Sequence, residues 1–166
     1  TELCAAIGSL FKAQNGLMIS QNHHNCIMTK DARFSSDTLW HQDIRYWSFS
    51  DDNLISAWIA LGPEFANNGG LKVLPGSHLT EFSPSSFDSD LFFRTDFDEN
   101  KEFLRGELQI TLNAGDVFLF HSRLLHAANR NRGDETKLSL VFTYYDESNS
   151  PKKGTRSDNL PPIKVR

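Results

Sequence analysis

The feature that most constrains the fold of this chain is a succession of short segments rich in β-branched and aromatic residues, separated by turn signals. Several short strands at near-regular spacing, without alternating helices, are typical of a sandwich or barrel rather than a parallel α/β sheet. The sequence therefore predicts an all-β domain. Its candidate strands are residues 17–19, 25–29, 40–47, 54–61, 70–74, 107–112, 116–121, 124–129 and 137–145.

One short helix is expected before the first strand. Leu3, Ile7 and Leu10 recur at three- and four-residue spacing, which places them on one helix face within residues 2–12. An Asn-Gly pair then provides a stop signal. The predicted fold class is therefore all-β with a short N-terminal helix.

The length of 166 residues, 39% of them hydrophobic, suits one core rather than two. We predict a single domain over residues 1–148, interrupted by a loop insertion at 79–106 that is rich in Ser, Asp, Glu and Phe. Loops of this length are typically lids, binding loops or disordered segments. The tail 149–166 has three prolines and five basic residues and is expected to be extended or disordered.

Charge and cysteine content exclude several classes of protein. A formal net charge of −4 gives no electrostatic footprint for nucleic acid or an anionic membrane. No apolar run reaches the roughly 18 to 20 residues that span a bilayer. The two cysteines, Cys4 and Cys26, are too few for a disulfide scaffold, and we expect reduced thiols in a cytoplasmic protein.

The strongest local signal for chemistry is Trp40-His41-Gln42-Asp43. On a strand, His41 and Asp43 share one face and Gln42 points the opposite way. An imidazole and a carboxylate supply two metal ligands, and one more histidine completes the facial set that suits non-haem Fe(II). If the strand stays regular, Arg45 lies on the same face and is a candidate for contact with an anionic substrate.

A third ligand is available in the second half of the chain. His121 and His126 both follow the apolar run 117–120, and periodicity does not choose between them. His23 and His24 are adjacent, so they would face opposite sides of a strand, and we interpret them as ordinary polar or core histidines.

A candidate receptor for a carboxylate lies at the start of the last predicted strand. Lys137 and Ser139 share one strand face by the period of two. A buried cation beside a hydroxyl at the mouth of an apolar barrel suits a carboxylate, because burial strengthens the ion pair and the hydroxyl adds direction.

Taken together, the sequence blocks of this chain resemble the phytanoyl-CoA dioxygenase family. The blocks are WHQD at 40–43, LISAWIAL at 54–61, NGGLKVLPGSH at 68–78, GDVFLFH at 115–121 and HAAN at 126–129. Their order and spacing are as distinctive as their letters, and the resemblance extends from about Ile27 to Tyr145. It implies a double-stranded β-helix, or jelly roll, that holds Fe(II) through the catalytic residues His41, Asp43 and His126.

The resemblance also implies 2-oxoglutarate as co-substrate. Lys137 stands where the family usually has an arginine that binds the far carboxylate, and Ser139 is available as a second donor. Ala128 stands where the family often has a serine. Trp58 and Gln42 match positions that line the family's active site and are expected near the co-substrate.

The implied activity is that of an Fe(II)- and 2-oxoglutarate-dependent dioxygenase. It would use molecular oxygen to hydroxylate an aliphatic carbon of a small organic substrate and decarboxylate 2-oxoglutarate to succinate, as a monomer or homodimer. The alternatives are a cupin-like metal-binding jelly roll, whose usual His-x-His pattern the chain lacks, and a catalytically silent family member that acts as a binding module. Family members usually carry sequence before the first core strand, so we expect these residues to be the barrel and little more.

Overall fold

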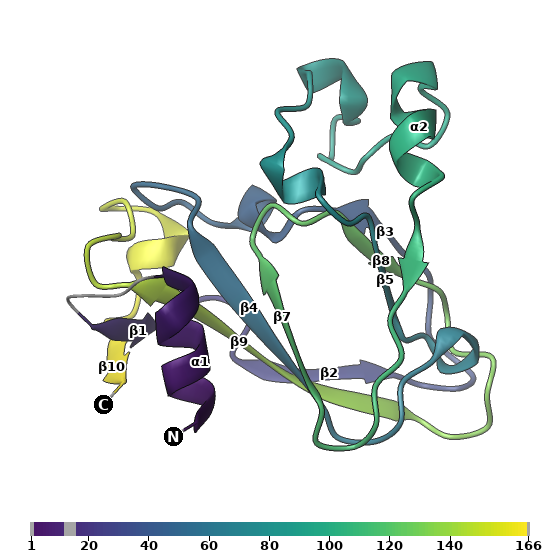
Figure 1. Cartoon of the computed structure of the whole chain (residues 1–166), viewed down its shortest axis with the longest axis horizontal. Helices are drawn as coiled ribbons and strands as arrows, with labels where there is room; N and C mark the ends of the chain where they lie inside the picture. The colour runs from purple at the N-terminus through teal and green to yellow at the C-terminus, as the bar shows by residue number, and fades with distance from the viewer. Residues whose placement is uncertain (1, 12–15, 166) are drawn as a thin grey trace.

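Two antiparallel sheets form the body of the protein in the computed structural model, which describes residues 2–11 and 16–165 (Figure 1). The larger sheet has the order β10-β1-β9-β4-β7, with β2 also pairing with β9, and the smaller sheet has the order β3-β8-β5-β6. This arrangement confirms the predicted all-β jelly roll. The larger sheet contains β1 (Leu17–Ile19), β2 (Cys26–Lys30), β4 (Leu54–Ala60), β7 (Val117–His121), β9 (Lys137–Asp146) and β10 (Ile163–Val165). The smaller contains β3 (Thr38–His41), β5 (Leu71–Val73), β6 (Leu108–Gln109) and β8 (His126–Ala128).

Both sheets contribute to one apolar core. Trp58 on β4, Phe120 on β7 and Val141 on β9 pack against Leu71 and Val73 on β5. Alternate positions along these strands point inward, so each sheet supplies one face of the core. The space between the sheets is therefore filled by side chains at one end and remains available for a site near β3 and β8.

The predicted N-terminal helix is α1 (Glu2–Phe11), which lies on the outer face of the larger sheet (Figure 1). Ile7 is fully buried and belongs to one cluster with Leu17, Ala57 and Tyr144. Lys12, the expected last residue of the helix, lies outside the described residues. In the described residues no helix has the length and apolar character needed to cross a membrane.

The insertion at 79–106 packs against the outside of the smaller sheet. It contains the 3-10 turns η4 (Pro84–Ser86) and η5 (Asp98–Asn100) and the short helix α2 (Lys101–Leu104). Two further 3-10 turns, η2 (Ala66–Asn68) and η3 (Ser77–Leu79), come earlier in the chain. Its phenylalanines show no period in the sequence because they converge from separate turns. The cluster comprises Phe82, Phe87, Phe93 and Phe103 with Trp40, Leu74, Leu125 and Ala127.

The strand predicted over 40–47 ends earlier than the sequence indicated. β3 ends at His41, and the 3-10 turn η1 (Asp43–Tyr46) follows. The Ile44 amide donates to the Ser122 carbonyl at 3.1 Å and the Trp47 amide to the Ile44 carbonyl at 3.0 Å, so the backbone turns instead of continuing the ladder. The predicted strand is therefore wrong from Asp43 onward, and strand alternation does not decide where Arg45 lies.

The C-terminal segment is fastened to the larger sheet. Its last strand, β10, pairs with β1, and the 3-10 turn η6 (Arg156–Asp158) precedes it. Buried Ser157 contacts the His23 ring at 2.7 Å and accepts from the Ser48 amide at 2.8 Å. Of the two forms expected for this segment, the structure therefore has an extended end for residues 163–165.

Candidate metal centre

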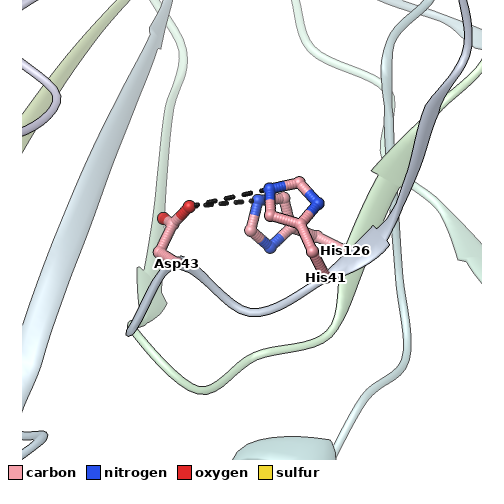
Figure 2. A group of neighbouring side chains, drawn as sticks. All are labelled: His41, Asp43 and His126. Carbon is pink, nitrogen blue, oxygen red and sulfur yellow. Dashed lines mark ion pairs between the residues drawn. The ribbon is translucent and has the colours of Figure 1, made fainter. Parts of the chain in front are cut away.

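Two histidines and one aspartate converge between the sheets (Figure 2). His41 ends β3 and His126 begins β8, and the two are register partners in the smaller sheet. Asp43 Oδ1 lies 3.5 Å from His126 Nε2 and 3.9 Å from His41 Nε2. One ligand atom from each residue lies within 4.8 Å of the others, which is the arrangement of a facial metal triad.

Backbone carbonyls orient both imidazoles. His41 Nδ1 lies 2.8 Å from the Leu39 carbonyl, and His126 Nδ1 lies 2.9 Å from the Leu124 carbonyl. A carbonyl only accepts, so each Nδ1 donates and each Nε2 presents its lone pair toward Asp43. Burial lowers the pKa of His41 to about 4, so its ring is neutral at ordinary pH and able to bind a metal.

Asp43 is fully buried and only half satisfied. Its Oδ2 accepts from Ser56 Oγ at 2.9 Å, whereas Oδ1 has no hydrogen-bond partner among the described residues. A buried carboxylate oxygen left without a partner is costly unless a cation meets it. Oδ1 faces both Nε2 atoms, so the residues present fit a divalent metal.

His24 lies against the same carboxylate. Its Nδ1 is 3.4 Å from Asp43 Oδ2, and the residue has the unusual backbone φ of 41°. His23, by contrast, turns away toward Ser157. The structure thus brings His24 beside the carboxylate without adding it to the three possible metal ligands, and its position depends on a left-handed turn that the sequence does not signal.

The remaining histidine candidate lies elsewhere. His121 packs against His78, with ring centroids 5.7 Å apart. Both line a cavity of about 560 Å³ that contains none of the three triad residues. Of the two histidines that periodicity left open, the structure brings His126 to His41 and Asp43.

Gln42 points away from the triad, as strand alternation predicts. Its Nε2 donates to the Arg123 carbonyl at 2.6 Å, and Gln42 does not line the cavity beside the triad. The structure thus gives it a positioning contact, because Arg123 belongs to the turn that leads into His126. The expected contact of Gln42 with a co-substrate stays a prediction.

Arg45 stacks on the insertion. Its guanidinium carbon lies 3.9 Å from the centroid of the Phe92 ring and 4.8 Å from that of Tyr46. Its Nη1 is buried without a hydrogen-bond partner among the described residues. Arg45 therefore ties η1 to residues 79–106 by cation–π contact.

Lys137 and Ser139 belong to a buried polar cluster with Glu64 and Trp58. Lys137 Nζ donates to Glu64 Oε2 at 3.1 Å and to Ser139 Oγ at 2.9 Å, and Ser139 Oγ donates to Glu64 Oε1 at 2.6 Å. Trp58 Nε1 lies 3.0 Å and 3.1 Å from the two Glu64 oxygens. Burial lowers the pKa of Lys137 while Glu64 raises it. No signal in the sequence pointed to Glu64, which follows Pro63 between β4 and β5, forms an isolated antiparallel bridge with Leu112 and belongs to no motif.

A cavity of about 140 Å³ joins the triad to this cluster. A second cavity, of about 560 Å³, opens beside His41 toward the insertion. The smaller one is lined by His24, Met28, Thr29, Lys30, Thr38, His41, Asp43, Trp58, Gly69, Leu71, Phe120, His126, Ala128 and Lys137. The larger one is lined by His23, His24, Met28, Asp37, Thr38, Leu39, His41, Tyr46, Trp47, Phe92 and Arg156.

Structural comparison finds the same fold in solved proteins of low sequence identity. The chain superposes on a non-heme monooxygenase, ThoJ in its apo form, with a TM-score of 0.76, 22% identity and coverage of 99% of this chain and 57% of that one. It superposes on the epimerase SnoN, solved in complex with Fe³⁺, alpha ketoglutarate and nogalamycin RO, with a TM-score of 0.73, 23% identity and coverage of 96% and 61%. These likenesses show a shared fold.

Sequence comparison is more specific. The human peroxisomal phytanoyl-CoA dioxygenase is 31% identical over 130 residues, which are 72% of this chain and 37% of that protein. A probable alpha-ketoglutarate-dependent hypophosphite dioxygenase of Stutzerimonas stutzeri is 29% identical over 63% of this chain and 38% of its own length. The chain thus spans less than half the length of these relatives. The family model for phytanoyl-CoA dioxygenase matches residues 2–139, and the chain belongs to this family.

Proposed function

We propose that this protein is an Fe(II)- and 2-oxoglutarate-dependent dioxygenase that hydroxylates an aliphatic carbon of a small organic substrate. The observation that carries the proposal is the unpartnered Asp43 Oδ1 facing the Nε2 atoms of His41 and His126. Two imidazoles and one carboxylate leave positions open on a six-coordinate ion, as an oxygenase requires. Family membership supplies the co-substrate class.

In this proposal His41, Asp43 and His126 are the catalytic metal ligands. The carbonyls of Leu39 and Leu124 hold the two rings, and Ser56 holds the carboxylate. When bound, the iron supplies oxygen activation coupled to decarboxylation of the keto acid to succinate. The protein contributes fixed ligand geometry and a buried site, because all three ligands are buried in the metal-free structure.

The smaller cavity is proposed as the site of 2-oxoglutarate. Its keto acid end would face the triad, and Lys137 with Ser139 would hold the far carboxylate. Trp58 forms one wall, and its indole N–H is fixed on Glu64. The ionic contact of Lys137 with Glu64 is the one feature that favours the second candidate, a silent binding module, because it occupies the cation that the family uses for the co-substrate.

The larger cavity is proposed as the substrate site. It touches His41 and is walled by Tyr46, Trp47 and Phe92, so a substrate carbon would meet the metal from the side of the insertion. A small organic molecule and molecular oxygen are the proposed partners. A cytoplasmic location and a monomeric or homodimeric state are part of the same proposal.

Succinate formation tests the proposal. Protein loaded with Fe(II) under nitrogen is mixed with 2-oxoglutarate in air, and succinate and oxygen consumption are measured with and without candidate substrates. We expect metal-dependent succinate formation that Asp43→Ala abolishes. Metal binding without any succinate or oxygen uptake, with every substrate tried, would favour the silent module.

A further inference from the structure

A second lysine faces the proposed co-substrate cavity. Lys30 ends β2 and is the direct register partner of Lys137 in the antiparallel β2–β9 pair. Both side chains line the cavity that begins at the triad. Like charges placed directly opposite each other destabilise a sheet. This arrangement therefore needs anions that balance the charges of the two lysines.

Among the described residues, the carboxylate that forms an ion pair with either lysine is Glu64, and its partner is Lys137. Glu64 is 1% exposed and its two oxygens accept from Lys137, Ser139 and Trp58. Lys137 and Glu64 thus form a buried pair with no net charge. A carboxylate ligand that approached Lys137 would meet the field of Glu64 as well, which weakens its attraction to this lysine.

Lys30 has only neutral partners. Its Nζ donates to the Ser36 carbonyl at 2.6 Å and to Thr38 Oγ1 at 2.9 Å, and it forms no ion pair with any described residue. Asp37, the acidic group that raises the pKa of Lys30, accepts from the Arg130 backbone amide at 2.6 Å instead of bonding to the lysine. An ammonium group has three donors, so Lys30 retains one and an unneutralised charge.

We propose that Lys30 supplies the ionic contact to the far carboxylate of 2-oxoglutarate. Lys137 belongs to the same anchor, but because Glu64 balances its charge it acts mainly as a hydrogen-bond donor. This inference rests on the proposed function. The cavity then carries one unneutralised positive charge at the end remote from the triad, which matches the single far carboxylate of the co-substrate. A keto acid that lacks this carboxylate would gain nothing from Lys30.

Paired ligands test this assignment without turnover. Calorimetry under nitrogen, on protein loaded with Ni(II), compares 2-oxoglutarate with 2-oxobutanoate, which keeps the keto acid and lacks the far carboxylate. Lys30→Met should weaken 2-oxoglutarate binding about 10- to 100-fold, the range for loss of a charged hydrogen bond. It should change 2-oxobutanoate binding by less than about twofold, since that ligand lacks the contact.

Two further variants provide a second test of the Lys30 charge and a control. Lys30→Gln keeps amide donors for Ser36 and Thr38 without the charge and should lose most of the same affinity. Lys153→Met removes an exposed lysine remote from the cavity and should leave both ligands unchanged. Unchanged 2-oxoglutarate binding in both Lys30 variants, or equal weakening of both ligands, would overturn the role of Lys30 alone. Absence of 2-oxoglutarate binding to the metal-loaded wild type would overturn the proposed function itself.

Discussion

The two ends of the 140 Å³ cavity contrast in how their polar atoms are satisfied. At the triad, Asp43 Oδ1 is buried without a partner and two Nε2 atoms face it. At the far end, both oxygens of Glu64 accept hydrogen bonds and Lys137 is paired. The difference teaches that burial and charge do not by themselves mark a ligand site. A ligand site is marked by buried polar atoms that face one another without hydrogen-bond partners, because without a ligand nothing compensates for their desolvation.

The largest effect is expected when the Asp43 carboxylate, whose Oδ1 has no hydrogen-bond partner among the described residues, is removed. Asp43→Ala deletes one of three proposed ligands, so we expect no measurable turnover and a loss of metal affinity well beyond the roughly 10- to 100-fold that loss of an outer-sphere partner costs. The fold should remain, since this carboxylate adds little to the core. Metal titration and circular dichroism check the two parts, with exposed Asp90→Ala as control. Unaltered turnover would remove the triad from the mechanism.

At the far end of the cavity, we expect a large effect when the ion pair of Lys137 and Glu64 is separated. Lys137→Met leaves Glu64 buried without its cation, and we expect a loss of about 3–5 kcal/mol of unfolding free energy. The double variant Lys137→Met with Glu64→Leu removes both charges and should recover most of that loss. Urea denaturation measures both. A double variant no more stable than the single one would show that the pair is not the source of the effect.

Lys137→Ala also addresses the co-substrate. If Lys137 contributes to the proposed anchor, protein that remains folded should need more 2-oxoglutarate for half-maximal turnover. Unaltered dependence on 2-oxoglutarate would remove Lys137 from the proposed anchor and leave Lys30 as its cation.

Acid should weaken the triad end of the metal-free protein. Burial lowers the pKa of His41 from 6.5 to about 4, so between these values the unfolded chain binds a proton that the folded chain does not. Stability therefore falls as pH drops from 6.5 toward 4, by up to about 3 kcal/mol from this residue. Unfolding free energy measured across this range, with His41→Asn as comparison, should show a shallower slope in the variant. Equal slopes would contradict the assignment.

The smallest effect is expected from the support of Asp43. Ser56→Ala removes the hydroxyl that donates to Oδ2 at 2.9 Å. We expect roughly tenfold weaker metal binding, the scale of an outer-sphere contact, and a loss of about 1–3 kcal/mol of unfolding free energy, because Oδ2 stays buried without its donor. Ser9→Ala, on exposed α1, is the matched control. Metal affinity equal to wild type would show that the backbone alone positions Asp43.

Much of the fold and of the triad was predictable because local patterns carried it. Short strands with turn signals predicted an all-β sandwich or barrel, the family resemblance narrowed this to a jelly roll, and residue types of metal ligands selected His41 and Asp43. The geometry that joins those two residues was not predictable. It depends on the hydrogen bond from the Ile44 amide of η1 to the carbonyl of Ser122, a residue far along the chain.

The far end of the cavity was the least predictable part. Lys30 meets Lys137 through the β2–β9 register, and Glu64 reaches Lys137 from an isolated bridge with Leu112, so both contacts depend on tertiary structure. Neither residue belongs to a local pattern. His24 joined the site through a left-handed backbone that its own sequence does not favour.

The central claim is that His41, Asp43 and His126 hold the metal that in turn holds 2-oxoglutarate. Titration calorimetry under nitrogen, adding Fe(II) and then 2-oxoglutarate, tests it most directly. We expect one Fe(II) to bind per chain and 2-oxoglutarate to bind only after the metal. Asp43→Ala should bind neither Fe(II) nor 2-oxoglutarate. Equal 2-oxoglutarate binding without metal, or undiminished Fe(II) binding by Asp43→Ala, would contradict it.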